Sequence, residues 1–194
     1  LGESTPRRRV EEGALLDTSR APTPPNAATG LSGAPVVGAV QPVVPAGPDP
    51  ALRFPLGLLA AVVATLVMDQ VMARLPEGET PPRIAAGVLT ETHPSDAVER
   101  LATVVHYLAG GLTGPLFVWL LYAGEYLAGS GLVTTLGVAV VLLALMIGFF
   151  AVVVLPRSRV RNSRRGSIVR DWALSAVAYL VVLVPIVYAG SELL

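Results

Sequence analysis

The stretch LVTTLGVAVVLLALMIGFFAVVVL, residues 132–155, contains 24 residues, no charge and only two polar side chains, those of Thr134 and Thr135. A helix of about 20 apolar residues crosses the ~30 Å hydrocarbon core of a bilayer. We therefore predict a membrane-spanning helix here. Because it is almost bare of polar groups, we expect it to be the most lipid-exposed span or to pack against an apolar partner.

Three more stretches have this character, so the expected spans are 54–75, 101–124, 131–155 and 172–190. The hydrophobic fraction of the chain is 53% and its charged fraction 14%, whereas a soluble domain has about 25% charged residues. These observations predict an all-α membrane protein, a bundle of four transmembrane helices. Its first partner is the lipid bilayer, and we expect no nucleic-acid partner.

The N-terminal part of the chain has a different composition. Residues 1–52 are rich in proline and alanine, with no helical period and few large apolar side chains. Such a segment cannot build a core, so we predict an extended or disordered tail followed by a transmembrane domain at 53–194. The first residue, Leu1, is not methionine, which is compatible with a processed N-terminus or a longer product.

The charges predict how the chain crosses the membrane. The connector 156–170 has no acidic residue, whereas the connector after the second span holds only Glu125. Arginine in short loops marks the cytoplasmic side. We therefore expect this arginine loop inside the cell membrane, both termini outside, and contacts from the loop to anionic lipid headgroups or an acidic partner. The loop's arginines are Arg157, Arg159, Arg161, Arg164, Arg165 and Arg170.

Polar residues recur at helical spacing on three of the spans. Steps of three and four place them on one face of each helix, and polar groups avoid lipid, so we expect these faces to meet inside the bundle. The predicted intramembrane polar seam consists of Thr65, Asp69, Thr103, His106, Asp171 and Ser175.

Asp69 and His106 carry the main site hypothesis. Each lies about six residues from the cytoplasmic end of its span, roughly 9 Å deep at ~1.5 Å per residue. We therefore predict a hydrogen bond between them, with Asp171 nearby. The pair fits a structural contact between helices, a proton relay or quinone contact, or a metal or haem role. The chain has only two histidines, so it cannot supply two histidine ligands to a membrane haem. We predict no metal site and no cofactor, with haem or quinone contact only as part of a larger complex.

Glycines on the second span indicate close helix packing. Gly110 and Gly114 form a GxxxG pattern with Gly111 beside them, and such patterns let membrane helices approach one another. Contact with another span of the same chain is favoured over homodimerisation. Ahead of this span, residues 81–89 are expected to form a short helix in the cytoplasmic interface.

Several functional classes are excluded or disfavoured. The absence of cysteine excludes disulfides and thiolate chemistry, and the absence of lysine excludes Schiff-base chemistry. No spacing typical of a catalytic triad, metal cluster or phosphate loop is present, so the sequence favours a non-catalytic protein over an enzyme. The main prediction is an accessory or scaffold subunit of a larger membrane complex, a respiratory one being a candidate. The alternative is a small transporter or proton-conducting protein that uses Asp69 and His106.

One resemblance to known proteins concerns about a third of the chain. The residues Pro81-Pro82-Arg83 and the segment His106-Tyr107-Leu108-Ala109-Gly110 resemble a pattern of uncharacterised small four-helix integral membrane proteins. Those proteins have a Pro-Arg loop and a His-x-x-x-Gly second helix. The resemblance implies a four-helix fold and no particular activity.

Overall fold

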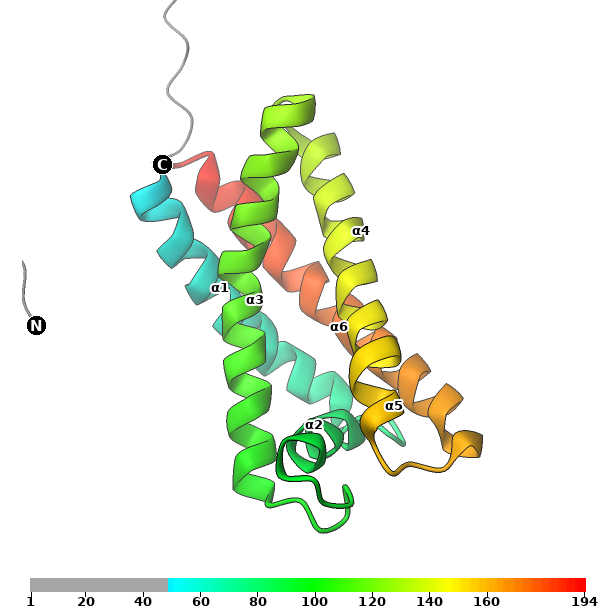
Figure 1. The fold of residues 1–194 in the computed structure, drawn as a ribbon. Helices are drawn as coiled ribbons and strands as arrows, with labels where there is room; N and C mark the ends of the chain where they lie inside the picture. The colour runs from blue at the N-terminus through cyan, green and yellow to red at the C-terminus, as the bar shows by residue number, and fades with distance from the viewer. Residues whose placement is uncertain (1–48) are drawn as a thin grey trace, which may run out of the picture. The chain divides into compact units, whose positions relative to one another are not determined.

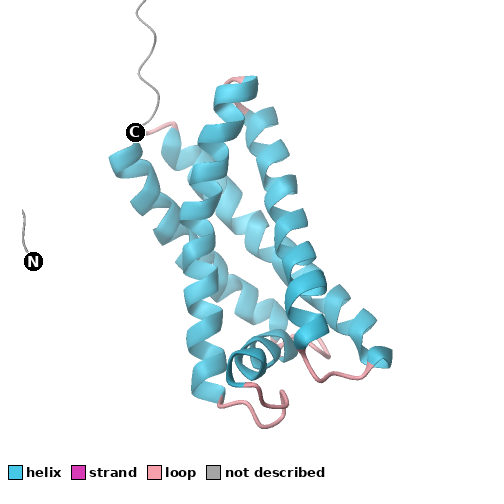
Figure 2. Cartoon of the chain, in the orientation of Figure 1, coloured by secondary structure: helices cyan, strands magenta, loops and turns pink. Residues whose placement is uncertain are grey.

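The computed structural model describes residues 49–194, and these form helices joined by short connectors with no strand among them (Figures 1 and 2). The predicted extended tail covers residues 1–52, of which residues 1–48 lie outside the described part of the chain. The elements are α1 (Pro50–Met72), α2 (Thr80–Thr90), α3 (Glu99–Ala128), α4 (Leu132–Gly148), the π-helical segment η1 (Phe149–Val154), α5 (Leu155–Arg157) and α6 (Asn162–Ser191).

Four of these helical segments are long and apolar enough to cross a membrane. They are α1, α3, the continuous run Leu132–Arg157 and α6. The predicted all-α bundle of four transmembrane helices is thereby confirmed, and the chain is a multi-pass membrane protein.

Several helix ends lie a few residues from the predicted ones, and two of these differences have a clear cause. Helix α1 begins at Pro50, inside the predicted tail, because the Asp49 carboxylate accepts the Ala51 N–H at 2.9 Å and proline needs no partner for its nitrogen at the first position. The arginine connector is also shorter than 156–170. Helix α6 starts at Asn162, since arginine is a good helix former and extends the helix beyond the apolar stretch.

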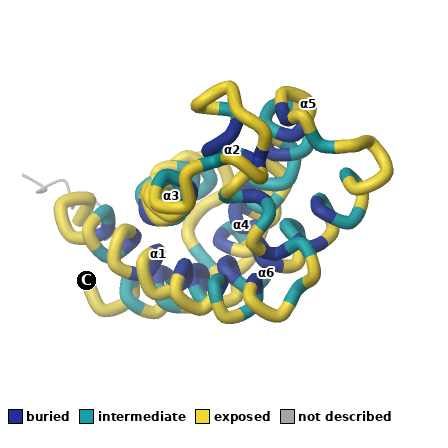
Figure 3. The backbone as a smooth tube through the Cα atoms, turned by 90° about the horizontal axis from the view of Figure 1, so that it is seen from below, coloured by how far each residue is buried: buried dark blue, intermediate teal, exposed yellow. Residues whose placement is uncertain are grey.

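The spans pack in a closed cycle in which α1 and α4 each contact both α3 and α6 and share no extensive contact with each other (Figure 1). Helix α2 lies at the end of the bundle where α1 ends and α3 begins, packed mainly on α3 and touching α6 and η1. In the view from below, buried residues (dark blue) lie on the facing sides of the helices (Figure 3). The short helix predicted at 81–89 is therefore present as α2, and Ile84 anchors it with no exposed surface.

Small residues allow α1 and α3 to approach each other closely. A Cβ atom on Gly114 would lie 2.0 Å from the Gly57 carbonyl oxygen, and one on Gly110 would lie 2.3 Å from Thr65 Oγ1. A Cβ on Gly111 would meet only a Leu58 methyl at 3.8 Å, an ordinary contact. Two of the three glycines singled out in the sequence thus face α1 of the same chain at short range.

The spans differ in how much of their surface the bundle covers. In the most apolar 18-residue segments of α1 and α6, 39% is buried inside the bundle. In the corresponding segments of α3 and of the span that begins with α4, 28% is buried. The third span is therefore no more exposed than α3. The reason is the packing: α1 and α6 share the most extensive helix contact, which leaves less of both uncovered.

Candidate functional site

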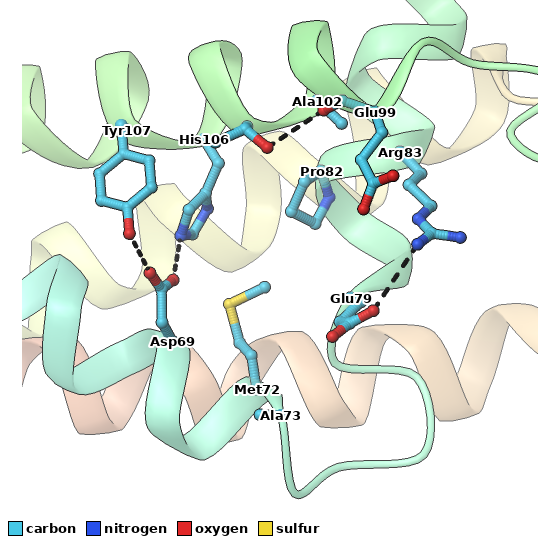
Figure 4. Close-up of a pocket in the computed structure, with 11 residues that line it drawn as sticks. Asp69, Met72, Ala73, Glu79, Pro82, Arg83, Glu99, Ala102, His106 and Tyr107 are labelled. Carbon is cyan, nitrogen blue, oxygen red and sulfur yellow. Dashed lines mark hydrogen bonds and ion pairs between the residues drawn. The ribbon is translucent and has the colours of Figure 1, made fainter.

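Asp69 of α1 lies between two side chains of α3, as Figure 4 shows. His106 Nε2 is 2.7 Å from Asp69 Oδ1, and the Tyr107 hydroxyl donates to Oδ2 at 2.5 Å. The hydrogen bond predicted between Asp69 and His106 is thus present. Tyr107 was not predicted as a partner, although its position next to His106 places it on an adjacent part of the same helical turn.

The Asp69 carboxylate determines which atoms of this cluster donate hydrogen bonds and which accept them. A carboxylate in its ionised form can only accept hydrogen bonds, and with that form of Asp69 the partner is the N–H of His106 Nε2. In a neutral imidazole the other nitrogen, Nδ1, is then an acceptor. Among residues 49–194 nothing is hydrogen-bonded to His106 Nδ1, and only 10% of this side chain is exposed. The cluster therefore has one unused hydrogen-bonding position.

The cluster forms part of a polar pocket of about 280 Å³ at the α2 end of the bundle (Figure 4). Glu99 and Thr103 of α3 contribute to the wall, and α2 contributes Arg83, which pairs with Glu79 at 3.7 Å. The Asp69 side chain is 29% exposed. The carboxylate is therefore hydrogen-bonded and also accessible from this pocket.

His106 also lines a second pocket, of about 200 Å³ and almost wholly apolar. Its aromatic wall comes from η1 and α6 and consists of Phe149, Phe150, Trp172 and Tyr179. Pro82 of α2 lines both pockets as well. The imidazole of His106 is thus placed between a polar space and an apolar one.

The remaining residues of the predicted polar seam do not join this cluster through their side chains. The hydroxyls of Thr65, Thr103 and Ser175 each donate to the backbone carbonyl four residues earlier, at 2.8, 3.1 and 2.9 Å. Thr65 and Ser175 are buried, whereas Thr103 is exposed and lines the polar pocket. Three of the six seam residues, Asp69, Thr103 and His106, therefore share one pocket.

Asp171 belongs to a different network. It is fully buried and accepts the Glu77 backbone N–H at 3.0 Å and two bonds from Arg170, at 3.0 and 2.9 Å. Glu77 in turn binds Arg164 at 2.7 Å. These contacts fasten the α1–α2 connector to the first turns of α6. Burial acts to raise the pKa of Glu77, but hydrogen bonds from Arg164 and Thr80 outweigh it and hold the pKa below its usual value.

The arginines of the predicted loop consequently have different surroundings. Arg164 and Arg170 pair with acidic residues of the same chain, and Arg157 donates to the Val153 carbonyl at 2.5 Å. Arg159 and Arg161 are exposed, and Arg165 Nε is buried without a hydrogen-bond partner among the described residues.

A buried ion pair at the opposite end of the bundle was not predicted. Arg53 of α1 binds Glu125 of α3 through two bonds of 2.7 Å and donates from Nε to Ser191 of α6 at 3.0 Å. Its guanidinium lies 4.9 Å from the centre of the Tyr122 ring. A usable signal was present in the sequence, because the start of α1 and the end of α3 lie on the same side of the membrane in consecutive antiparallel spans.

The comparisons with known proteins give no further identification. The chain matches no protein-family model, and neither curated proteins nor solved structures include a similar one. Within residues 49–194 no group of three or more metal-ligating side chains comes together. The fold and the site together define a four-span helical membrane protein with a carboxylate, imidazole and phenol cluster near one end of the bundle.

Proposed function

We propose that this protein is a non-catalytic accessory subunit of a larger membrane complex, in which the Asp69, His106 and Tyr107 cluster exchanges protons on one side of the membrane. The observation that carries the proposal is that, within residues 49–194, the cluster is open towards one end of the bundle. It lines a pocket at the α2 end, and Asp69 is partly exposed there. A site that is accessible from one side suits a complex in which a neighbouring subunit supplies the rest of the proton path or the reaction that uses the protons.

The other half of the bundle is closed by packing. Gly114 lies against Gly57, and the side chains of Phe117, Val118 and Leu121 have no exposed surface. Beyond them the Arg53–Glu125 pair joins α1 to α3. A protein that moved protons or solutes by itself would need polar or water-filled access to both sides. In this arrangement the chain provides access to one side.

The test of the accessory role is purification of the tagged full chain from its native membrane in a gentle detergent, followed by mass spectrometry. We expect defined partner subunits in constant proportion, absent when an unrelated multi-pass protein carries the same tag. Recovery of the chain as a homogeneous species without partners contradicts the proposal.

A second candidate function, a small proton-conducting protein or transporter, is favoured by the position of His106 between the two pockets. The purified chain would be reconstituted into liposomes that contain a pH-sensitive dye. Conduction is supported if a pH step causes proton flux through the original chain and if this flux is lost in Asp69→Asn and in His106→Gln. Flux equal to that of empty liposomes excludes it and leaves the accessory role.

The topology proposed for the cell membrane has the arginine connector in the cytoplasm and both termini outside. It is supported by the arginines near residues 157–170 and their scarcity near the other membrane face. Because the chain has no cysteine, single cysteines can report it. An impermeant maleimide should label Ser130→Cys, on the α3–α4 connector, in intact cells, and Ser163→Cys only after lysis. The reverse pattern contradicts this topology.

Anionic lipid headgroups are proposed as ligands of the exposed arginines on that side. Arg159 and Arg161 have no ion pair among the described residues, whereas Arg164 and Arg170 are already paired within the chain. Basic residues near an anionic surface contribute about 1 kcal/mol each. Replacing Arg159 and Arg161 with glutamine should therefore weaken co-purification of anionic lipid. The same change at Arg164 should weaken it less.

A further inference from the structure

We propose that the apolar pocket next to His106 binds the single-ring headgroup of a lipid-soluble quinone or quinol, with His106 Nδ1 as the polar anchor. This inference goes beyond the accessory role, because it assigns a ligand to a site whether or not partner subunits are present. It is carried by four properties of the pocket: its size, its aromatic lining, its one available polar group and its position beside lipid.

The size fits one ring. The pocket holds about 200 Å³, and an apolar cavity of about 150 Å³ is known to hold one benzene molecule. A substituted six-membered ring therefore fits, whereas a phospholipid headgroup with its charges does not suit an apolar wall. A long isoprenoid or alkyl tail would remain in the bilayer.

The lining suits a flat ring. Phe149 and Phe150 come from η1, and π-helical turns are frequent at functional sites because they displace side chains from the regular register. Phe150 packs on Trp172 with ring centres 5.2 Å apart. Aromatic rings favour offset or tilted contacts with other rings, so a quinone ring finds complementary surfaces here.

The other polar side chains that line the pocket already make hydrogen bonds, which leaves one group to bind the ligand. The hydroxyl of Tyr179 donates to the Gly110 carbonyl at 2.8 Å, and that of Thr113 donates to the Ala109 carbonyl at 2.7 Å. The Trp172 N–H points to the Met146 carbonyl at 3.3 Å. The lining contains the side-chain rings of Trp172 and His106. The Trp172 nitrogen is hydrogen-bonded, whereas His106 Nδ1 has no hydrogen-bond partner among the described residues.

The protonation of His106 matches both forms of such a ligand. With Nε2 donating to Asp69, a neutral imidazole accepts a hydrogen bond at Nδ1 from a quinol hydroxyl. Donation from Nδ1 to a quinone carbonyl requires the imidazolium form, in which both ring nitrogens are donors. The proposal concerns binding of the two forms and includes no electron transfer by this chain.

The access route is lateral. Helices α3 and α4 diverge towards the α2 end (Figure 1), and no extensive contact joins α3 to η1. Phe149 at this edge is 61% exposed. Within a bilayer such an edge faces lipid, so a ligand dissolved in the membrane reaches the ring site from the side.

The chain supplies its own reporter for a test. It has two tryptophans, of which Trp172 lines the pocket and Trp119 is 60% exposed on α3. The variant Trp119→Phe in lipid nanodiscs therefore reports on Trp172 alone, and decylubiquinone, which quenches tryptophan fluorescence, serves as the probe. We expect decylubiquinone to quench the fluorescence of Trp172 until the site is saturated. In Trp172→Phe the remaining signal from Trp119 should follow membrane partitioning and rise without saturation.

Two variants in the Trp119→Phe background test the assigned contacts. His106→Ala should weaken the apparent affinity about three- to tenfold, the effect of one net hydrogen bond. Ala109→Phe places a ring inside the pocket and should abolish saturation, whereas Ala123→Phe, on the same helix and outside the pocket, should leave it unchanged. Circular dichroism and gel filtration identify any variant that fails to fold, and Ala109→Phe does not depend on the histidine contact.

Specific outcomes overturn the proposal. Non-saturable quenching of Trp172, or saturation that is equal in Ala109→Phe and Ala123→Phe, shows that the ring does not occupy this pocket. Competition by decylbenzene as effective as decylubiquinone itself, with no effect of His106→Ala, shows that the pocket holds an alkyl chain without polar recognition.

Discussion

Arg53 of α1 and Glu125 of α3 form two hydrogen bonds of 2.7 Å each although 72 residues separate them in the chain. The arginine side chain is 3% exposed and the glutamate 17%. Two parallel bonds between a guanidinium and a carboxylate fix both the distance and the orientation of the partners. The pair therefore sets the register of α1 against α3 at the end of the bundle opposite the cluster.

Removing one member of this pair should be strongly destabilising. Glu125→Gln leaves the Arg53 charge buried without its counter-ion, and breaking a buried pair costs up to about 3–5 kcal/mol. The double variant Arg53→Met with Glu125→Leu should lose less than the single one. Thermal unfolding in detergent checks this, with Glu79→Gln as control, because Glu79 pairs with Arg83 on the surface at 3.7 Å and exposed pairs contribute only ~0–1 kcal/mol.

The glycine contact between α1 and α3 predicts a positional difference among alanine substitutions. Gly114→Ala places a methyl group 2.0 Å from the Gly57 oxygen, so the helices must separate and the melting temperature should fall. Gly137→Ala on α4 meets nothing within 4 Å and should be neutral or stabilising by up to about 1 kcal/mol through helix propensity. Equal melting temperatures for the two variants would exclude close α1–α3 packing.

The network at the α1–α2 connector predicts a sensitivity to acid. The pKa of Glu77 in the folded protein lies below its ordinary value of 4.5, so its ionised form stabilises the fold above that pH. This contribution is lost as the pH falls through the unfolded value towards the folded one. Glu77→Gln should therefore lower the melting temperature at pH 7 by more than at pH 4. Glu192→Gln, at an exposed residue, should show no such convergence.

The cluster itself predicts small effects on stability. Tyr107→Phe removes one donor to Asp69, and hydrogen bonds between membrane helices contribute about 0.6 kcal/mol on average. Asp69→Leu should cost more, because it leaves the donors of both His106 and Tyr107 without their acceptor. Unfolding of the two variants in the same detergent checks the order. A larger loss for Tyr107→Phe than for Asp69→Leu would contradict the assigned roles.

Local properties of the sequence were sufficient for the four spans and for the Asp69–His106 contact. Span length follows from counting apolar residues, and two polar residues at equal depth on consecutive spans have few partners besides each other. The position of α2 also followed from its local pattern. Each of these predictions needed only the residues of one or two helices and their positions along them.

Contacts that depend on packing could not be predicted in this way. Asp171 had been assigned to the seam by its helical face, but its partner at 3.0 Å is a backbone N–H of the α1–α2 connector, which no residue pattern reveals. The apolar pocket depends on the divergence of α3 from α4 and on the π-helical turn at Phe149–Val154. Arg53 and Glu125 each resemble an ordinary charge at a membrane boundary, and only their shared side of the membrane in consecutive antiparallel spans indicates that they could pair.

The Arg53–Glu125 pair has a consequence for biogenesis. The ribosome synthesises Arg53 first, and the glutamate follows only after 72 further residues. Until then the first turn of α1 carries an uncompensated charge, which favours keeping that turn at the membrane surface. We therefore expect the first span to reach its final depth when the second lies beside it, so that the two insert as a hairpin.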